Sequence, residues 1–321
     1  VHGLPIEMEV QKELGLEDPQ EIDEYGIANF NEACRRQVQT NTENWERVTR
    51  KIGRWVDFDN DYKTMDPDFM ESVWWVFKEL WKNKLIYKDY KVLPYSWAAS
   101  TPLSNFEANM DYREIEDPSI FFTLKAKVDY KKIKKNDEFL VWTTTPWCIP
   151  GNLAVAIGNE ITYSRILLNN TFYWIAKERL HELKDYDYEI IDESIGSDLV
   201  GAEYIPAYEE FKDEYTNGAF TLIHSDDTNT ESGSGLVSQA PAYGESDFYS
   251  LKNAGIDTIV DPVTMSGRFD KSVKGLEDKY VKDADQIIIQ QLDDKGLLFS
   301  QTVETHSYPF CWRTGQPLIY K

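Results

Sequence analysis

Cysteine and histidine are scarce in this sequence, and their spacing speaks against two kinds of site. Only three cysteines occur, Cys34, Cys148 and Cys311, and none belongs to a C-x-x-C pair. Such a small, odd and widely spaced set predicts no disulfide framework and favours a reducing cytoplasm. The four histidines are equally scattered, so the sequence offers no ligand spacing for a structural zinc ion. We therefore expect no metal site.

Long apolar runs and positive charge are also missing. No run approaches the roughly 20 apolar residues of a membrane span. The first residues, "VHGLPIEMEV", lack the basic and then apolar layout of a signal peptide. The net charge is −22, with 34 basic against 56 acidic residues, so the surface repels polyanions. We expect no membrane partner, and a nucleic acid would have to be held locally or through another part of the protein.

The 321 residues include 41% hydrophobic residues, enough for one large domain or two ordinary ones. Residues 1–90 have a helical pattern, with helix starts predicted at Asp18-Pro19 and Asp66-Pro67. Apolar residues after the second start recur at helical spacing, and we expect its tryptophans Trp74, Trp75 and Trp81 to lie in a core.

After Tyr90 the pattern changes. Residues 91–117 are extended and rich in turns, which predicts an outgoing ribbon. Short strand patterns with a few helices fill residues 118–303, including a hairpin at Asn169-Asn170 and helices that stop at Gly255 and Gly296. Residues 304–321 predict a returning ribbon. The expected class is α+β, with two paired ribbons bracketing a strand-rich domain that is inserted into another fold.

The stretch "VWTTTPWCIPGNLAVAIG", residues 141–158, places three threonines between two apolar runs. One interpretation is that Thr143, Thr144 and Thr145 are β-branched residues selected for strand propensity. The other is a cluster of short donors and acceptors that holds a hydroxyl-rich ligand and a water molecule.

A second stretch, "GSGLVSQAPAYGESDFY", covers residues 233–249. Its glycines allow tight turns or the close approach of a ligand to the backbone. Asp247 begins a predicted helix. Its carboxylate either caps that helix and interacts with the helix dipole, or faces a pocket and binds a cationic group such as an ammonium.

Together the two stretches resemble the inserted editing domain of isoleucyl-tRNA synthetases. The flanks "HGLPIE", "TPLSNFE", "DPVTMSGRF", "YVKDAD" and "YPFCWRTGQPLIYK" are also similar to that family, so the resemblance covers essentially the whole chain. It is greatest for the branch that includes the eukaryotic cytosolic enzymes. Leucyl and valyl relatives carry Thr-Thr-Arg-Pro where this chain has Thr-Thr-Thr-Pro.

The resemblance implies a barrel-like editing domain that hydrolyses valyl-tRNA(Ile) after transfer, as a second sieve. A hydrophobic pocket rejects a side chain one methylene smaller by only about 1–3 kcal/mol, a limit for which the isoleucine enzymes are the standard example. The implied partner is the 3′ end of tRNA(Ile) carrying the wrong amino acid, and we expect a monomer.

The resemblance also assigns roles to residues. Asp247 would hold the α-ammonium, while Thr144 and Thr145 would contact the ester and the attacking water. The other implied substrate-binding residues are Thr143, Trp147, Cys148, Asn152, Ser238 and Tyr243. Trp147 would meet the adenosine, and Asn152 would support the turn. Because no histidine accompanies Asp247, catalysis by positioning, assisted by a ribose hydroxyl of the substrate, is expected.

Two positions depart from the family pattern, which usually has Thr at Cys148 and His at Ser238. That histidine is implied to help exclude isoleucine, so either another side chain such as Tyr243 closes the pocket or the discrimination is weaker. Cys148 has no neighbouring histidine in sequence to make it a nucleophile. An alternative function is therefore an inserted module that only positions the tRNA end, with lost or weakened editing.

Neither the His-Ile-Gly-His nor the Lys-Met-Ser-Lys-Ser type motif of the parent synthetases occurs here. The chain has the pattern of an excised insertion domain rather than of a freestanding editing protein. We expect no aminoacylation from it, no cofactor for editing, and a use of ATP and Mg²⁺ only by the parent enzyme.

Overall fold

The computed structural model describes residues 3–16 and 19–321, which form two compact units that divide between Tyr90 and Lys91. Each unit is described by itself. Within the described residues, no helix has both the length and the apolar character needed to cross a membrane.

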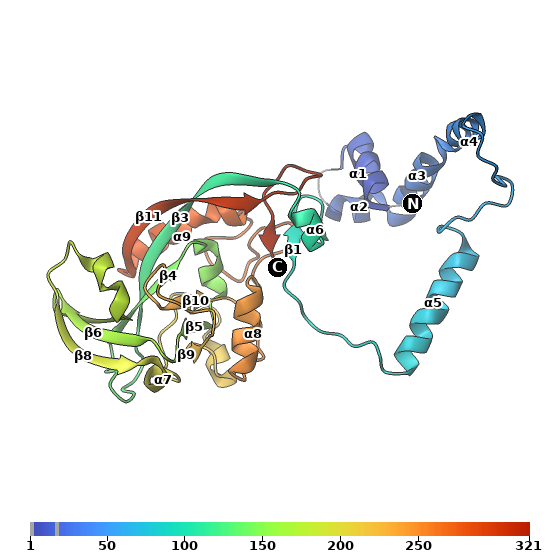
Figure 1. Cartoon of the computed structure of the whole chain (residues 1–321). Helices are drawn as coiled ribbons and strands as arrows, with labels where there is room; N and C mark the ends of the chain where they lie inside the picture. The colour runs from blue at the N-terminus through green and yellow to red at the C-terminus, as the bar shows by residue number, and fades with distance from the viewer. Residues whose placement is uncertain (1–2, 17–18) are drawn as a thin grey trace. The chain divides into compact units, whose positions relative to one another are not determined.

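The first unit is helical. Its helices are α1 (Gly3–Leu14), α2 (Pro19–Tyr25), α3 (Ile27–Gln39), α4 (Thr42–Lys51) and α5 (Pro67–Lys82) (Figure 1). Asp66 occupies the N-cap of α5 and Pro67 its first turn, as the sequence predicts. Asp18, the other predicted start, lies outside the described residues, although α2 does begin at Pro19.

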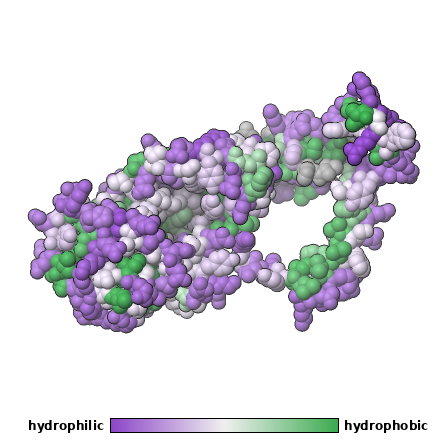
Figure 2. Space-filling view, viewed as in Figure 1, coloured by the Kyte–Doolittle hydropathy of each residue, from purple (hydrophilic) through white to green (hydrophobic). Residues whose placement is uncertain are grey.

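The expectation that the α5 tryptophans lie in a core is wrong for this chain. Trp74 is 68% exposed, and Trp75 and Trp81 are similarly exposed. Figure 2 shows the apolar surface that α5 presents. Most apolar residues of the helix share one broad face, as in a helix that packs against a partner. The described residues of the unit bury none of the α5 side chains.

The second unit is built on one mixed sheet. Its strands are β3 (Tyr112–Lys125), β4 (Glu138–Thr143), β5 (Ala154–Ile157), β6 (Thr162–Leu168), β7 (Thr171–Ala176), β8 (Glu189–Ile195), β9 (Thr221–His224), β10 (Val237–Gln239) and β11 (Leu298–Pro309). The order is β8-β6-β7-β4-β10-β5-β9, and β3 joins β4 to β11. The sheet curls into a half-barrel (Figure 1), which confirms the predicted α+β class with a barrel-like sheet.

A long antiparallel pair forms the ribbon. β3 and β11 pair from Tyr112 and Pro309 as far as Phe122 and Leu298. A smaller sheet joins β1 (Pro94–Ser96) to β2 (Thr101–Pro102) and to β12 (Ile319–Tyr320), so the two extended segments meet again near the end of the chain. The predicted boundaries between ribbon and domain fall at residues 117–118 and 303–304. β3 and β11 run through these positions without a break.

Helices lie around this sheet. They are α6 (Asn105–Ala108), η1 (Pro146–Gly151), η2 (Lys177–Leu183), α7 (Gly196–Leu199), η3 (Lys212–Asn217), α8 (Glu245–Asn253) and α9 (Val281–Asp294). α9 buries an apolar stripe that includes Ala284, Ile288 and Leu292 in the same core as the sheet residues Phe122, Phe139 and Trp174. Gly255 and Gly296 follow α8 and α9 with positive φ, as the sequence predicts for helix ends.

Candidate functional site

The two sequence stretches meet at one pocket of about 320 Å³ in the second unit. The expected site residues that line it are Thr143, Thr144, Thr145, Trp147, Cys148, Ser238, Tyr243 and Asp247. Asn152 does not line the pocket, but its side-chain amide donates to the hydroxyl of Ser238, which does. Other lining residues were not predicted from the sequence, among them Trp142, Tyr308 and Tyr320. Both tyrosines lie within "YPFCWRTGQPLIYK". That segment resembles the family, but no role was predicted for its residues.

The pairing of β4 with β10 brings the stretches together. The two strands run parallel, with Val237 opposite Trp142, so the threonines leave the sheet beside Ser238. The Thr145 amide donates to the Thr143 hydroxyl at 3.1 Å, which turns the chain into η1 at Pro146. Thr143 ends its strand, as propensity alone would explain, whereas Thr144 and Thr145 lie beyond the strand. All three threonines line the pocket.

A buried carboxylate on α9 anchors η1. The Trp147 amide donates to Asp285 Oδ1 at 2.8 Å. Burial raises the pKa of Asp285 to about 7, although the charge of Lys282 and the bond from Trp147 both oppose this rise. Asp285 ends the quoted motif "YVKDAD", so the signal for this residue was present but carried no assigned role.

Trp147 and Tyr243 form an aromatic wall of the pocket. Their ring centroids are 4.8 Å apart, and the Tyr243 hydroxyl donates to Asp261 Oδ1 at 3.1 Å. Trp147 is only 2% exposed, so any contact with a ligand uses a narrow part of its ring.

Asp247 lies in the first turn of α8, with its carboxylate beside the N-terminal end of the helix. Oδ2 accepts from the Ala240 amide at 2.8 Å, upstream of the helix. The carboxylate packs over Gly244, where a Cβ atom would lie 2.5 Å from Asp247 Cγ. Burial raises the pKa of Asp247 to about 6, despite the bonds from Ala240 and Ser246. A carboxylate in this setting gains most from a cationic partner.

Cys148 is a poor nucleophile in this pocket. Burial raises the pKa of its thiol well above the usual value, and the nearby carboxylates of Asp247 and Asp285 add to the rise. The thiol therefore stays protonated at neutral pH, and the protonated form is the unreactive one.

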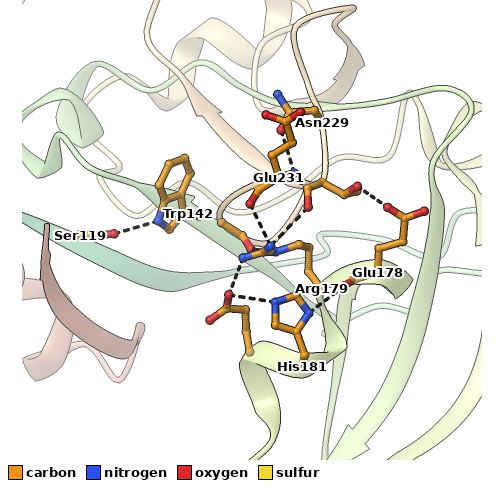
Figure 3. A network of polar contacts seen from close by, with 10 residues as sticks. Ser119, Trp142, Glu178, Arg179, His181, Asn229 and Glu231 are labelled. Atoms are coloured by element: carbon orange, nitrogen blue, oxygen red, sulfur yellow. Dashed lines mark hydrogen bonds and ion pairs between the residues drawn. The ribbon is translucent and has the colours of Figure 1, made fainter. Parts of the chain in front are cut away.

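A buried arginine holds the chain that leads into the second stretch (Figure 3). Arg179 of η2 donates to the carbonyl oxygens of Thr230, Glu231 and Gly233, the last at 2.8 Å, and pairs with Glu182. Trp142, whose indole donates to the Ser119 hydroxyl at 2.9 Å, lies against Gly233. No pattern in the sequence points to Arg179.

The glycines of "GSG" are explained by packing. Gly233 has φ of 65°, and a Cβ atom there would lie 2.5 Å from Trp142 Cδ2. Gly235 has φ of 76°, and its Cβ atom would lie 2.5 Å from Ala176 Cβ. Both residues need the left-handed region and the missing side chain, and the packing is sufficient to explain them.

Comparison with known proteins agrees with the resemblance to tRNA synthetases described under the sequence analysis. Residues 1–208 match the family of tRNA synthetases class I (I, L, M and V). The whole chain is 42% identical to the cytoplasmic isoleucine–tRNA ligase of Mus musculus and covers 26% of it. It is 43% identical to an isoleucine–tRNA ligase of Bdellovibrio bacteriovorus and covers 30% of that protein. The chain thus spans between a quarter and a third of the length of these relatives.

Among solved structures, the editing domain of the P. falciparum cytosolic leucyl-tRNA synthetase aligns with 58% of this chain and 99% of its own, at a TM-score of 0.44 and 9% identity. The P. knowlesi counterpart aligns with 57% of this chain and 95% of its own, at a TM-score of 0.43 and 8% identity. The family match covers most of the sequence, and the chain therefore belongs to the class I tRNA synthetases of the isoleucine, leucine, methionine and valine group.

Proposed function

We propose that this chain is the editing part of an isoleucine–tRNA ligase and hydrolyses valyl-tRNA(Ile). The observation that carries the proposal is the Asp247 carboxylate. It lines a pocket rich in hydroxyl groups, its surroundings raise its pKa to about 6, and no salt bridge joins it to a described residue of this unit. An α-ammonium group would supply the missing charge through a short, charge-assisted hydrogen bond.

The proposed reaction is hydrolysis of an ester by positioning. With the ammonium held at Asp247, the hydroxyls of Thr144 and Thr145 contact the ester and the attacking water. The water oxygen bonds to the carbonyl carbon, the ester bond to the ribose breaks, and the ribose oxygen leaves with a proton. No histidine lines the pocket. A neighbouring ribose hydroxyl of the substrate is therefore the proposed proton carrier, and orientation supplies most of the rate.

The proposed partner is the 3′ end of tRNA(Ile), in the cytoplasm, and the protein is proposed to act as a monomer. ATP and Mg²⁺ would serve the aminoacylation reaction of the full-length enzyme. Within the described residues, no group of three or more His, Cys, Asp or Glu side chains could hold a metal ion.

The alternative is a module that positions the tRNA end without hydrolysing it. Ser238 favours this alternative, because the family usually has an imidazole at that position and the serine is smaller.

One assay separates the two functions. We would measure valine release from valyl-tRNA(Ile) by the full-length protein, comparing Asp247→Ala with Glu245→Ala. Glu245 is an exposed carboxylate in the same helical turn, which makes it a matched control. Editing predicts that Asp247→Ala lowers the rate by about 10- to 100-fold, the value of a hydrogen bond to a charged group, and that Glu245→Ala does not. Negligible hydrolysis by the unmodified protein would instead support the positioning module.

A further inference from the structure

Asn152 is held in one orientation by its neighbours. Its Nδ2 atom lies 2.8 Å from the Ala154 carbonyl oxygen and 2.9 Å from Ser238 Oγ. Its Oδ1 atom accepts from the hydroxyl of Tyr204, whose side chain is fully buried. A carbonyl oxygen requires a donor and a phenol supplies one, so both ends of the amide are assigned by their partners.

This orientation decides where the proton of Ser238 points. The Asn152 amide nitrogen has no lone pair to offer, so Ser238 Oγ is the acceptor in their bond. The hydroxyl proton must then be directed elsewhere, and among the described residues it has no acceptor. Ser238 is half-buried and lines the pocket, so the proton is available to a bound molecule.

We propose that Ser238 is a ligand-binding residue whose hydroxyl donates to an acceptor oxygen of the bound ligand, with Tyr204 as a positioning residue that acts through Asn152. This inference rests on the proposed function. It assigns Ser238 a hydrogen bond in addition to any effect of its size.

The spacing between Ser238 and the residue that holds Asp247 limits which groups a ligand can carry. Ala240, whose amide holds Asp247, follows Ser238 by two residues, so the two positions lie about 6–7 Å apart in extended chain. A ligand that bridges them carries a cation and an acceptor oxygen a few bonds apart. An α-aminoacyl ester has this arrangement, and its acceptor is either the ester group or a hydroxyl on the acyl side chain.

The test compares Ser238→Ala, Ser238→Thr, Tyr204→Phe and the double variant Tyr204→Phe/Ser238→Ala in the full-length protein. Two quantities are measured: the rate of valyl-tRNA(Ile) hydrolysis, and the Kd of a non-hydrolysable valyl-adenosine amide. We expect Ser238→Ala to weaken both by about tenfold, the value of one hydrogen bond, and Ser238→Thr to restore them. Tyr204→Phe should weaken both about threefold, and should have no further effect once Ser238 is replaced by alanine.

A purely structural role for Tyr204 would give the same factor in both backgrounds, and that result would overturn the proposal. Unchanged analogue binding by Ser238→Ala would also overturn it. Threonyl-tRNA(Ile) distinguishes the two acceptors: an equal loss for both esters assigns the ester group, and a larger loss for the threonyl ester assigns the side-chain hydroxyl. If the unmodified protein binds the analogue with this coupling but hydrolyses neither ester, the proposed editing function fails and the role of Ser238 stands.

Discussion

The proposed function depends most on Asp247, whose surroundings determine the pKa and the hydrogen bonds of its carboxylate. From the sequence alone, a helix-capping role explains this carboxylate as well as a ligand-binding role does. In the structure it accepts from the Ala240 amide of the preceding loop and also from its own amide in the first turn of α8, and it packs over the N-cap residue Gly244, which has no side chain. The decisive contacts join residues of the loop before α8 to its first turn, and the helical pattern alone does not reveal them.

Replacement of Asp247 by asparagine should stabilise the protein at neutral pH. A raised pKa means that the native state binds the proton more tightly than the unfolded chain. The contribution of Asp247 to stability is therefore greatest below about pH 4, falls as the pH rises to about 6, and then stays lower by roughly 2–3 kcal/mol. The asparagine side chain would keep an acceptor for the Ala240 amide without this charge. We expect Asp247→Asn to gain about 1–3 kcal/mol near pH 8.

Urea unfolding followed by circular dichroism near pH 4 and pH 8 measures this effect. Asp285, whose pKa burial raises to about 7, should leave a remaining slope in the variant up to that pH. Asp247→Ala is the contrasting variant, because it leaves the Ala240 amide without its acceptor at a cost of about 1–3 kcal/mol. If the pH dependence of the unfolding free energy is unchanged in Asp247→Asn, then burial of the charged Asp247 carboxylate does not destabilise the protein.

At the scale of elements, the pocket is produced by the parallel pairing of β4 with β10. The sequence identified both strands, the helix α8 that follows β10 and the α+β class, because their patterns are local, whereas it predicted a turn where η1 follows β4. It did not identify Asp285 of α9, Arg179 of η2 or Tyr308 of β11. Each of these contacts the site, or the chain that leads into it, through a long-range arrangement that no local pattern encodes.

The turn before β10 gives an element-scale prediction. We expect Gly233→Ala to destabilise the protein far more than Gly255→Ala. Both glycines have positive φ, but a Cβ atom at Gly233 would lie 2.5 Å from Trp142, whereas one at Gly255 meets nothing within 4 Å. Gly255→Ala should cost about 1 kcal/mol from backbone strain, and Gly233→Ala about 2–4 kcal/mol from strain and displacement of Trp142. Thermal unfolding of both variants checks this order, and equal losses would contradict the packing explanation.

At the scale of the whole molecule, charge limits how this chain meets a nucleic acid. Its net charge of −22 repels a phosphate backbone, so under the proposed function only the end of a tRNA would make contacts, within the pocket. The exposed apolar surface of α5 shows, in addition, that the first unit leaves part of its apolar area uncovered within the described residues.

We therefore expect the 321-residue chain to bind whole tRNA weakly, with a Kd above about 1 μM at physiological salt. Fluorescence anisotropy with labelled tRNA(Ile) over a range of salt concentrations measures this affinity. A submicromolar Kd that weakens steeply with salt would reveal a phosphate-binding surface that the net charge does not suggest.

The central claim is that Asp247 holds a ligand ammonium in the threonine-lined pocket. The most direct test compares hydrolysis of valyl-tRNA(Ile) with that of its 2-hydroxyisovaleryl analogue, in which a hydroxyl replaces the ammonium. Each rate is divided by the rate of spontaneous hydrolysis. The full-length protein should favour the valyl ester by about 10- to 100-fold, the value of a charge-assisted bond, and Asp247→Asn should remove that preference. Equal rates for the two esters in the unmodified protein, or an undiminished preference in Asp247→Asn, would contradict the claim.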